Sequence, residues 1–440
     1  MLGTVRVAVP FSIPGELVRV QLSRSRDRHE ATGRIVSVLT PSPHRTHARC
    51  RHFGPAAGAS CGGCTWQHLA YPAQLELKRA LVADAVRRTL QHPPPVEPTL
   101  PSGSGTPWHY RQKVHFVFGR AGRNGRLTTM GHYARGTQHL VPVVECPVHD
   151  DRGNAVAFQM AEALAGSGGS ESPLASIVAR VSRSTGDVMV TLVTEGPPGR
   201  RLRDVSRKVL TARAGVTSLH TSIHTGRGSP SFGDRTRSVS GTDRIAEQID
   251  GVTYLISPTT FFPTNGQAAA ELLRAVMRTV PADLPVLDLY CGSGLFALPL
   301  AKRGQRVIGI EANPAAVADA VASRHANGIP PALCRFVAAT AESGVTRTHP
   351  RDARCVLLHP PRSGASAAVL DEVLERLRPD LLVYVSCDAQ SLAADLGKVE
   401  QGGYRITGLQ PLDMFPHMAE VETVAVAHLV EGGLGHARRV

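Results

Sequence analysis

The stretch PVLDLYCGSGLFALPLAKRG (285–304) decides the fold of this 440-residue chain, because it reads as a strand, a glycine turn and a helix. A short apolar run leads to Asp288, and Gly292 and Gly294 follow in a turn where the backbone can approach a ligand closely. From about residue 261 onward, strand and helix patterns alternate, which is typical of a doubly wound sheet. We therefore predict a Rossmann-like α/β domain over residues 261–440.

The next strand indicates what the glycine turn binds. It ends in Glu311, 23 residues after Asp288. An acidic residue at about this distance can accept hydrogen bonds from the hydroxyls of a ribose. NAD is the alternative ligand, but Ala297 occupies the place of the third glycine in its motif, and a carboxylate at Asp288 would repel a pyrophosphate. The pattern therefore favours S-adenosylmethionine (SAM).

A second strand-to-helix junction lies in VYVSCDAQSLAADL (383–396), where an apolar run ends at Ser-Cys-Asp and a helical pattern begins. In open α/β sheets, ligands bind at the carboxyl ends of the strands. A helix N-terminus also lowers the pKa of a thiol, so Cys387 is a candidate nucleophile. The alternative is a small buried apolar side chain, the commoner role of a free cysteine. A further strand ends in His359, which we expect at the same edge.

Cysteines also cluster in the first third of the chain. Cys61 and Cys64 form a Cys-Gly-Gly-Cys pair that can point both thiolates at one ion, and Cys50 precedes them. Cys146, in VECPVHD, is the best candidate for a fourth ligand. Four thiolates fit either zinc or a 4Fe–4S cluster, and the spacing does not decide between them. A redox dithiol is a third option, although no thioredoxin-like pattern surrounds the pair.

The first third is the basic part of the chain. The net charge is +13, and residues 1–150 contain 19 Lys and Arg against 8 Asp and Glu. This balance predicts a module that binds a polyanion, with an arginine-rich solvated surface as the alternative. Residues 1–42 contain short β-branched runs, typical of a small barrel that binds single-stranded nucleic acid. We expect the barrel to be partial, because the pattern lacks its first strand.

The segments between this barrel and the α/β domain have three patterns. Residues 72–90 have the apolar periodicity of a helix, and the proline-rich run 92–107 reads as a linker. Residues 108–260 look β-rich and include a hairpin over 177–194. Four aromatic side chains alternate with basic ones, so they form either an RNA-stacking surface or the core face of a sheet: Trp108, Tyr110, Phe116 and Phe118.

Some classes of protein are disfavoured by the sequence. No apolar run reaches the roughly 18 residues of a membrane span, and the first residues lack a signal-peptide pattern. We expect a cytoplasmic monomer without a membrane partner. In that compartment, clustered cysteines more often bind metal or act in catalysis than form disulfides.

Seven motifs, taken together, resemble those of the RNA uracil-5-methyltransferase family. The resemblance is to the branch that has an N-terminal TRAM domain, which is an OB-like RNA-binding module, and an iron–sulfur cluster, and that acts on 23S ribosomal RNA. In chain order the motifs are CGGCTWQHL, VECPVHD, FFPTN, DLYCGSG, HPPRSG, SCDAQSLAADL and FPHMAEVE. The implied domains are a partial TRAM-like barrel (1–45), a cysteine segment with a helix (46–92), a β-rich RNA-binding domain (93–260) and a class I SAM-dependent methyltransferase domain (261–440).

The resemblance also implies roles for single residues. Cys387 would be the nucleophile and Glu422 the base. The cofactor site would include Asp288, Tyr290, Gly292, Gly294, Glu311 and His359. The 4Fe–4S ligands would be Cys50, Cys61, Cys64 and Cys146. Carbon 5 of uracil is a poor nucleophile, so a thiolate must first add to carbon 6, and a carboxylate must later remove the proton from carbon 5.

Two residues depart from the family pattern. Pro263 stands where the family usually has a Gln that contacts SAM, and His359 stands where it usually has Asp. Proline offers no side-chain hydrogen bond, and the charge of a histidine depends on pH. We expect an enzyme acting on 23S rRNA, with transfer RNA as the second candidate substrate. The alternative class is an RNA-binding homologue with impaired catalysis.

Overall fold

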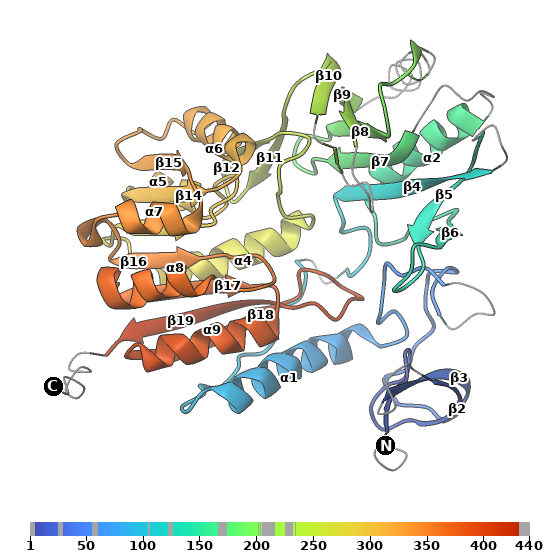
Figure 1. Cartoon of the computed structure of the whole chain (residues 1–440), viewed down its shortest axis with the longest axis horizontal. Coiled ribbons are helices and arrows are strands. Elements are labelled where there is room, and N and C mark those ends of the chain that lie inside the picture. Colours follow the sequence, from blue (N-terminus) through green and yellow to red (C-terminus); the bar gives the residue numbers. More distant parts are fainter. Residues whose placement is uncertain are drawn as a thin grey trace.

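The computed structural model describes residues 5–24, 30–54, 60–103, 106–121, 126–165, 174–200, 202, 204, 216–224, 232–233 and 235–430. The chain forms a small N-terminal sheet, a central sheet and a larger C-terminal α/β domain (Figure 1). A long helix, α1 (Tyr71–Thr89), runs from the N-terminal sheet along the C-terminal domain. It confirms the helix predicted over residues 72–90.

The C-terminal sheet has seven strands in the order β15-β14-β13-β16-β17-β19-β18. Five are parallel, and β19 pairs antiparallel with both β17 and β18. The predicted doubly wound sheet is therefore confirmed. The strands are β13 (Val286–Leu289), β14 (Val307–Glu311), β15 (Cys334–Ala338), β16 (Cys355–Leu358), β17 (Leu381–Ser386), β18 (Tyr404–Leu412) and β19 (Glu422–Leu429).

Successive residues of each strand pack alternately into two apolar layers, one on each face of this sheet. Val383 and Val385 point into the layer that contains α4, whereas Leu382 and Tyr384 point into the layer that contains α1. Both faces are covered, which explains why the strands read as continuous apolar runs. The helices of this domain are α4 (Gly266–Thr279), α5 (Ala297–Lys302), α6 (Pro314–Ala326), α7 (Ala341–Arg347), α8 (Ala367–Asp371) and α9 (Ala389–Gln401), with short turns η1 (Pro350–Asp352) and η2 (Glu372–Leu377).

The central sheet has the strand order β10-β9-β8-β7-β4-β5-β6 and carries α2 (Asp151–Ala165) against it. Its strands are β4 (Lys113–Ala121), β5 (Arg126–Tyr133), β6 (Leu140–Pro142), β7 (Leu174–Val181), β8 (Val188–Thr194), β9 (Val216–Ile223) and β10 (Arg235–Gly241). The pairing of β7 with β8 confirms the predicted hairpin. A two-stranded ribbon, β11 (Ile245–Ile249) and β12 (Val252–Ile256), leads to the C-terminal domain.

The aromatic residues at the start of the central sheet are core residues. Tyr110, Phe116 and Phe118 are buried, and the Tyr110 hydroxyl donates to the Pro416 carbonyl at 3.1 Å. The idea that these three rings form an RNA-stacking surface is therefore wrong. Alternation along a strand places aromatic side chains on one face, but it does not show whether that face meets solvent or another layer.

The N-terminal sheet has three strands among the described residues: β1 (Arg6–Ala8), β2 (Leu17–Arg24) and β3 (Glu30–Thr40). β1 pairs parallel with β3, and β2 pairs antiparallel with it. An OB-fold has five strands, so the TRAM-like barrel stays a prediction.

Helix α1 holds the segment that precedes β19. Its Lys78 ammonium donates to Asp413 Oδ1 at 2.5 Å and to the Phe415 carbonyl at 3.0 Å, and both charged side chains have no exposed surface. Further along the chain, Glu97 donates its N–H to the Leu409 carbonyl of β18 at 2.9 Å. The proline-rich run after α1 thus lies beside the edge of the C-terminal sheet.

Within the described ranges, no helix combines the length and the apolarity that a bilayer crossing requires.

Candidate active site and cysteine cavity

The predicted site residues lie along one edge of the C-terminal sheet, in the order of the strands. Glu311 ends β14, Asp288 lies near the end of β13, His359 follows β16 and Cys387 follows β17. Glu422 begins β19, which is antiparallel to β17, so it lies at the same edge. The structure therefore brings together side chains that are far apart in the sequence.

The turn after β13 is held by the Glu311 carboxylate. Its Oε2 accepts a hydrogen bond from the Gly292 N–H at 3.1 Å, and its Oε1 accepts one from the Asn313 N–H at 2.8 Å. Gly292 has φ +54°, and a Cβ atom built there would meet nothing within 4 Å. Gly294 has φ +84°, and a Cβ there would approach Leu298. An oriented carboxylate beside open backbone fits a ligand that carries a ribose.

Tyr290 also adopts an unusual backbone conformation at this turn. Its φ is +62°, which is rare for a residue with a side chain, and strain of this kind collects at ligand sites. The ring is half-buried against the apolar layer that contains α1. Pro263 lines a small pocket with Gln112 and Arg180 of the central part of the chain. Its segment also contacts the glycine turn, because the Ser293 hydroxyl donates to the carbonyl of Phe261 at 3.4 Å.

Asp288 is a buried carboxyl group with little compensation. Neither of its side-chain oxygens makes a hydrogen bond of regular geometry with the described residues, although the nearby Ala297 N–H partly stabilises its charge. Burial raises its pKa to about 7, against the partial effect of the nearby His359, which lowers it. A ligand that donates a hydrogen bond or carries a positive charge would satisfy these oxygens.

The Asp288 carboxyl makes the stability of the ligand-free chain depend on pH. Its pKa is near 4 in an unfolded chain and about 7 in the folded one, so only the folded chain keeps the proton between these values. The free energy of unfolding should therefore fall by roughly 4 kcal/mol between pH 4 and pH 7, and level off above pH 7. Asp288→Asn, which carries no charge, should reduce this dependence.

Urea unfolding at several pH values would measure this effect as the difference between wild type and Asp288→Asn. Asp283→Asn is the matched control, because Asp283 is exposed and lies just before the same strand. The control should follow the wild type. Equal pH dependence in Asp288→Asn and wild type would contradict the assignment.

Cys387 and Glu422 are neighbours because of strand register. Ser386 of β17 pairs with Thr423 of β19, so the next residue on each strand faces the other. The pKa of the Cys387 thiol is raised, chiefly by burial and also by the Glu422 carboxylate, while Arg362 acts in the opposite direction. The expectation that the helix N-terminus would lower this pKa is wrong. The Asp388 side chain caps the helix, accepting hydrogen bonds from its first N–H groups.

His359 lies beside the Glu422 carboxylate. Its Nε2 is 3.3 Å from Glu422 Oε1, and its ring centroid is 5.7 Å from that of Phe296. The Glu422 side chain is 5% exposed and that of His359 is 22% exposed. Nearby, Arg362 donates to Glu420 at 3.3 Å.

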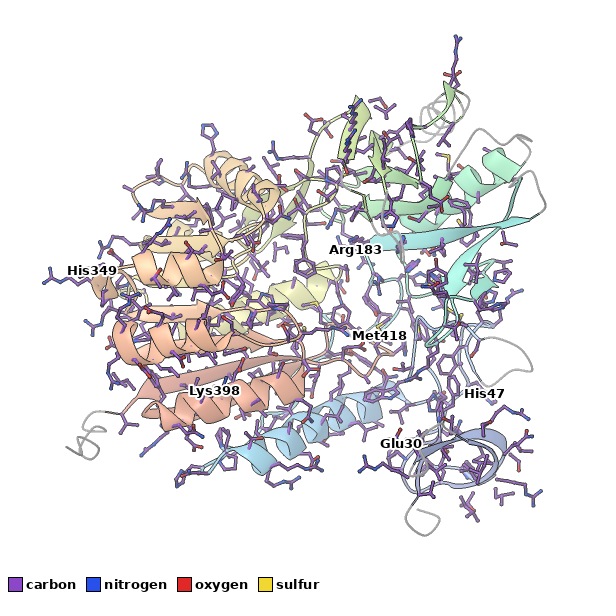
Figure 2. The ribbon with its side chains drawn as sticks, viewed as in Figure 1. Glu30, His47, Arg183, His349, Lys398 and Met418 are labelled. Atoms are coloured by element: carbon purple, nitrogen blue, oxygen red, sulfur yellow. The ribbon has the colours of Figure 1, made fainter. Side chains whose placement is uncertain are left out.

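The four clustered cysteines line one cavity of about 260 Å³: Cys50, Cys61, Cys64 and Cys146. Burial raises the pKa of Cys64 to about 12 and that of Cys146 to about 11. Buried thiols of this kind become thiolates only when cations compensate their charge. Met418, from the segment before β19, also lines the cavity and lies at the centre of the molecule (Figure 2).

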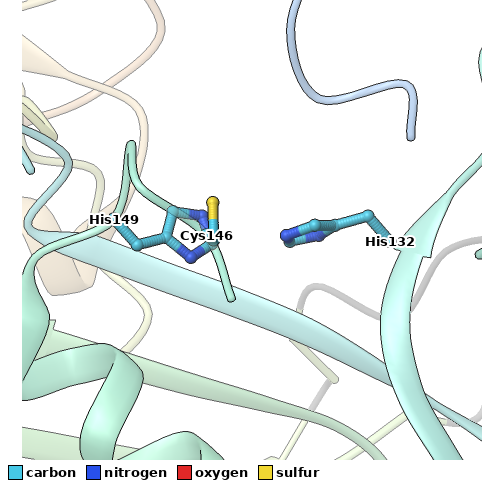
Figure 3. A group of neighbouring side chains, drawn as sticks. All are labelled: His132, Cys146 and His149. Atoms are coloured by element: carbon cyan, nitrogen blue, oxygen red, sulfur yellow. The ribbon is translucent and has the colours of Figure 1, made fainter. Parts of the chain in front are cut away.

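Histidines that the sequence analysis did not identify lie in the same cavity. The ligand atoms of His132, Cys146 and His149 lie within 4.8 Å of one another, with the rings on either side of the sulfur (Figure 3). His149 follows Cys146 at a Cys-x-x-His spacing, which was visible in the sequence. His132 comes from β5, and its sequence context gave no comparable signal.

Comparison with known proteins places these observations in a family context. A family model for tRNA (uracil-5-)-methyltransferases matches residues 239–428. A protein named as an uncharacterized RNA methyltransferase in Thermosynechococcus vestitus is 35% identical over 429 residues, which cover 96% of this chain and 92% of the relative. A protein with the same description in Gloeobacter violaceus is 34% identical over 431 residues, covering 95% and 90%.

A solved structure is also similar over nearly the whole chain. It is the tRNA (uracil-54, C5)-methyltransferase of Pyrococcus abyssi in complex with S-adenosyl-L-homocysteine. The two chains are 27% identical, 95% of each is covered, and the TM-score is 0.73.

Proposed function

Because the chain belongs to the RNA uracil-5-methyltransferase family, we propose that it methylates carbon 5 of a uridine in structured RNA through Cys387 and Glu422. The observation that carries this proposal is the register of β17 and β19, which sets a thiol and a buried carboxylate side by side at the ligand-binding edge of the sheet. A nucleophile and a base are the two groups that this reaction requires.

The thiol acts first. The Cys387 thiol loses its proton to water, the resulting thiolate adds to carbon 6 of uracil, and the electrons of the carbon 5–carbon 6 double bond move toward the ring carbonyl. Carbon 5 becomes nucleophilic, and bound SAM would supply the methyl group that it takes. Because the thiol lies half-buried at the sheet edge, the target base must leave its stack to reach it.

The carboxylate acts second. Glu422 removes the proton from carbon 5, the carbon 5–carbon 6 double bond forms again, and the carbon–sulfur bond breaks. The electron pair of that bond returns to Cys387 as a thiolate. Glu422 Oε1 accepts no hydrogen bond from the described residues, and His359 Nε2 lies 3.3 Å from it.

The SAM site fits the residues at the turn after β13. The Glu311 carboxylate is positioned for ribose hydroxyls, Gly292 and Gly294 let the backbone come close, and Tyr290 closes one side. The unsatisfied Asp288 oxygens would accept from the ammonium group that SAM carries. The proposed SAM contacts do not include Pro263.

Two RNA classes are candidates for the substrate. The motif order and the cysteine cavity support 23S rRNA as the first. The likeness to the Pyrococcus abyssi tRNA (uracil-54, C5)-methyltransferase over 95% of the chain supports transfer RNA as the second.

Incubation of the protein with methyl-labelled SAM and unmodified transcripts of each RNA would decide between the two substrates. Label in 5-methyluridine of rRNA supports the first candidate, label in tRNA alone supports the second, and label in neither contradicts the proposed activity.

We propose a 4Fe–4S cluster as the occupant of the cysteine cavity. A single tetrahedral ion with zinc–sulfur bonds of about 2.3 Å would hold its sulfurs about 3.8 Å apart. All four cysteines line the cavity, and the group of ligand atoms that lies within 4.8 Å of one another is that of His132, Cys146 and His149. A lining of four thiolates is the ligand set that a 4Fe–4S cluster requires. The cluster would tie Cys146 of the central domain to the segment that contains the other three.

Cys64→Ser should remove the cluster. Wild-type protein purified without oxygen is expected to be brown, with iron at the stoichiometry of one 4Fe–4S cluster, because thiolates bind such clusters. The variant should lose most of the iron and the colour. Iron and zinc analysis of each preparation makes the measurement, and Cys387→Ser, outside the cavity, is the control that keeps its iron. A colourless wild type with one zinc per chain would overturn the assignment.

A further inference from the structure

We propose that His359 takes the proton that Glu422 has removed from carbon 5 and passes it to solvent. This inference rests on the function proposed above and gives a role to the residue that departs from the family pattern. His359 acts through Glu422 and does not itself touch the reacting carbon.

The need for a relay follows from burial. The Glu422 side chain is 5% exposed, and it must be a carboxylate again before the next turnover. A carboxyl group that keeps its proton cannot act as a base, and a buried one exchanges protons slowly with water unless another group accepts them. The chain supplies such a group at 3.3 Å, because His359 Nε2 is that far from Glu422 Oε1.

The partial exposure of the His359 ring gives the proton a path to water. The His359 side chain is 22% exposed, about four times the exposed fraction of Glu422, so its other nitrogen can reach water. An imidazole can bind a proton at one nitrogen and release one from the other. The backbone fixes the ring, since the His359 N–H donates to the Leu289 carbonyl at 3.3 Å and two prolines follow.

Groups from three elements face the His359 ring. Asp288, from β13, interacts electrostatically with His359, and Glu422 faces it from β19. Phe296, from the turn before α5, covers part of the ring without contributing charge. The group that must lose its proton, the Glu422 carboxyl, is thus the one placed 3.3 Å from the ring nitrogen.

The proton balance is simple. The Glu422 carboxylate takes the carbon 5 proton as the carbon–sulfur bond breaks, which leaves a carboxylic acid and the Cys387 thiolate. The acid gives its proton to His359 Nε2, which restores the carboxylate and forms an imidazolium. The imidazolium loses a proton from Nδ1 to water. The step requires no oxidant, reductant or further reactant.

The test separates methyl transfer from proton release. RNA tritiated at carbon 5 of uridine, with methyl-labelled SAM, reports both in single-turnover reactions. In His359→Ala and His359→Gln, the release of tritium and free RNA, relative to formation of the methylated covalent adduct in the same variant, should be at least 10-fold slower than in the wild type. Gln can still contact Glu422 but cannot carry the proton, so slow release in both variants separates relay from packing. Imidazole added to His359→Ala should restore release, with a rate that rises with the neutral imidazole concentration.

His349→Gln, an exposed histidine at the far side of the same domain, is the matched control and should behave as wild type (Figure 2). Wild-type release in His359→Ala, or in His359→Gln, would overturn the relay while leaving the proposed methylation intact. Absence of methyl transfer by the wild type would instead contradict the proposed function, so the two failures are distinguishable.

Discussion

Cys387→Ala should abolish methyl transfer to RNA, lowering the rate by about 10⁴-fold or more, because carbon 5 of uracil cannot attack SAM without an adduct at carbon 6. The fold should survive, since the Cys387 side chain lies at the sheet edge and not in the apolar layers. Transfer of label from methyl-labelled SAM to RNA measures the rate. Circular dichroism and thermal unfolding confirm that the variant is folded.

The raised pKa of the Cys387 thiol predicts a second measurable property, the pH dependence of its alkylation. Burial and the Glu422 carboxylate favour the neutral thiol, so the thiolate fraction of free enzyme grows as the pH rises through the alkaline range. Alkylation of Cys387 by iodoacetamide, followed by mass spectrometry of its peptide, should therefore accelerate with pH. Cys387→Ala with undiminished transfer would remove Cys387 from the mechanism. A wild type without transfer on any rRNA or tRNA would favour the RNA-binding homologue.

Glu422→Gln should stop the reaction one step later. The amide cannot remove the proton from carbon 5, so the methylated RNA stays bound to Cys387 through its sulfur. We expect one methyl group transferred per enzyme, a covalent protein–RNA complex that survives denaturing gel electrophoresis, and multiple-turnover rates lower by about 10²–10⁴-fold.

Glu420→Gln is the matched control for this variant. Glu420 is two residues away and belongs to the same segment, but Arg362 binds it at 3.3 Å and a third of its side chain is exposed. It should turn over without accumulating the adduct. Normal turnover in Glu422→Gln, together with trapping in Glu420→Gln, would move the base to Glu420.

Sequence reasoning located part of the site because one rule of topology governs it. Asp288, Glu311, His359 and Cys387 all follow or end parallel strands, and such strand ends meet at one edge. Glu422 obeys no such rule, since it begins an antiparallel strand whose register with β17 is set by tertiary packing. Its role came from family resemblance, and its position needed the structure.

The predictions that the structure contradicts failed because they considered one segment of the chain at a time. The helix N-terminus at Cys387 predicts a lowered thiol pKa, but burial and the Glu422 carboxylate raise that pKa, and neither can be seen from the local sequence. Phe116 lies on the alternating strand β4 and Tyr110 just before it. Other parts of the fold bury both rings, which the sequence of this one segment does not show. His132 joins Cys146 only through the folding of the central sheet.

Helix α1 packs against the C-terminal half, which limits where the chain can be cut for engineering. Val82 and Val86 complete one apolar layer of the catalytic domain, and Lys78 neutralises the buried Asp413. A fragment that began at residue 261 would expose that layer and leave a carboxylate without its counter-ion, at a cost of several kcal/mol. The catalytic unit is thus discontinuous along the chain. Chimeras that exchange residues 1–70 should therefore keep residues 71–100 together with the C-terminal half.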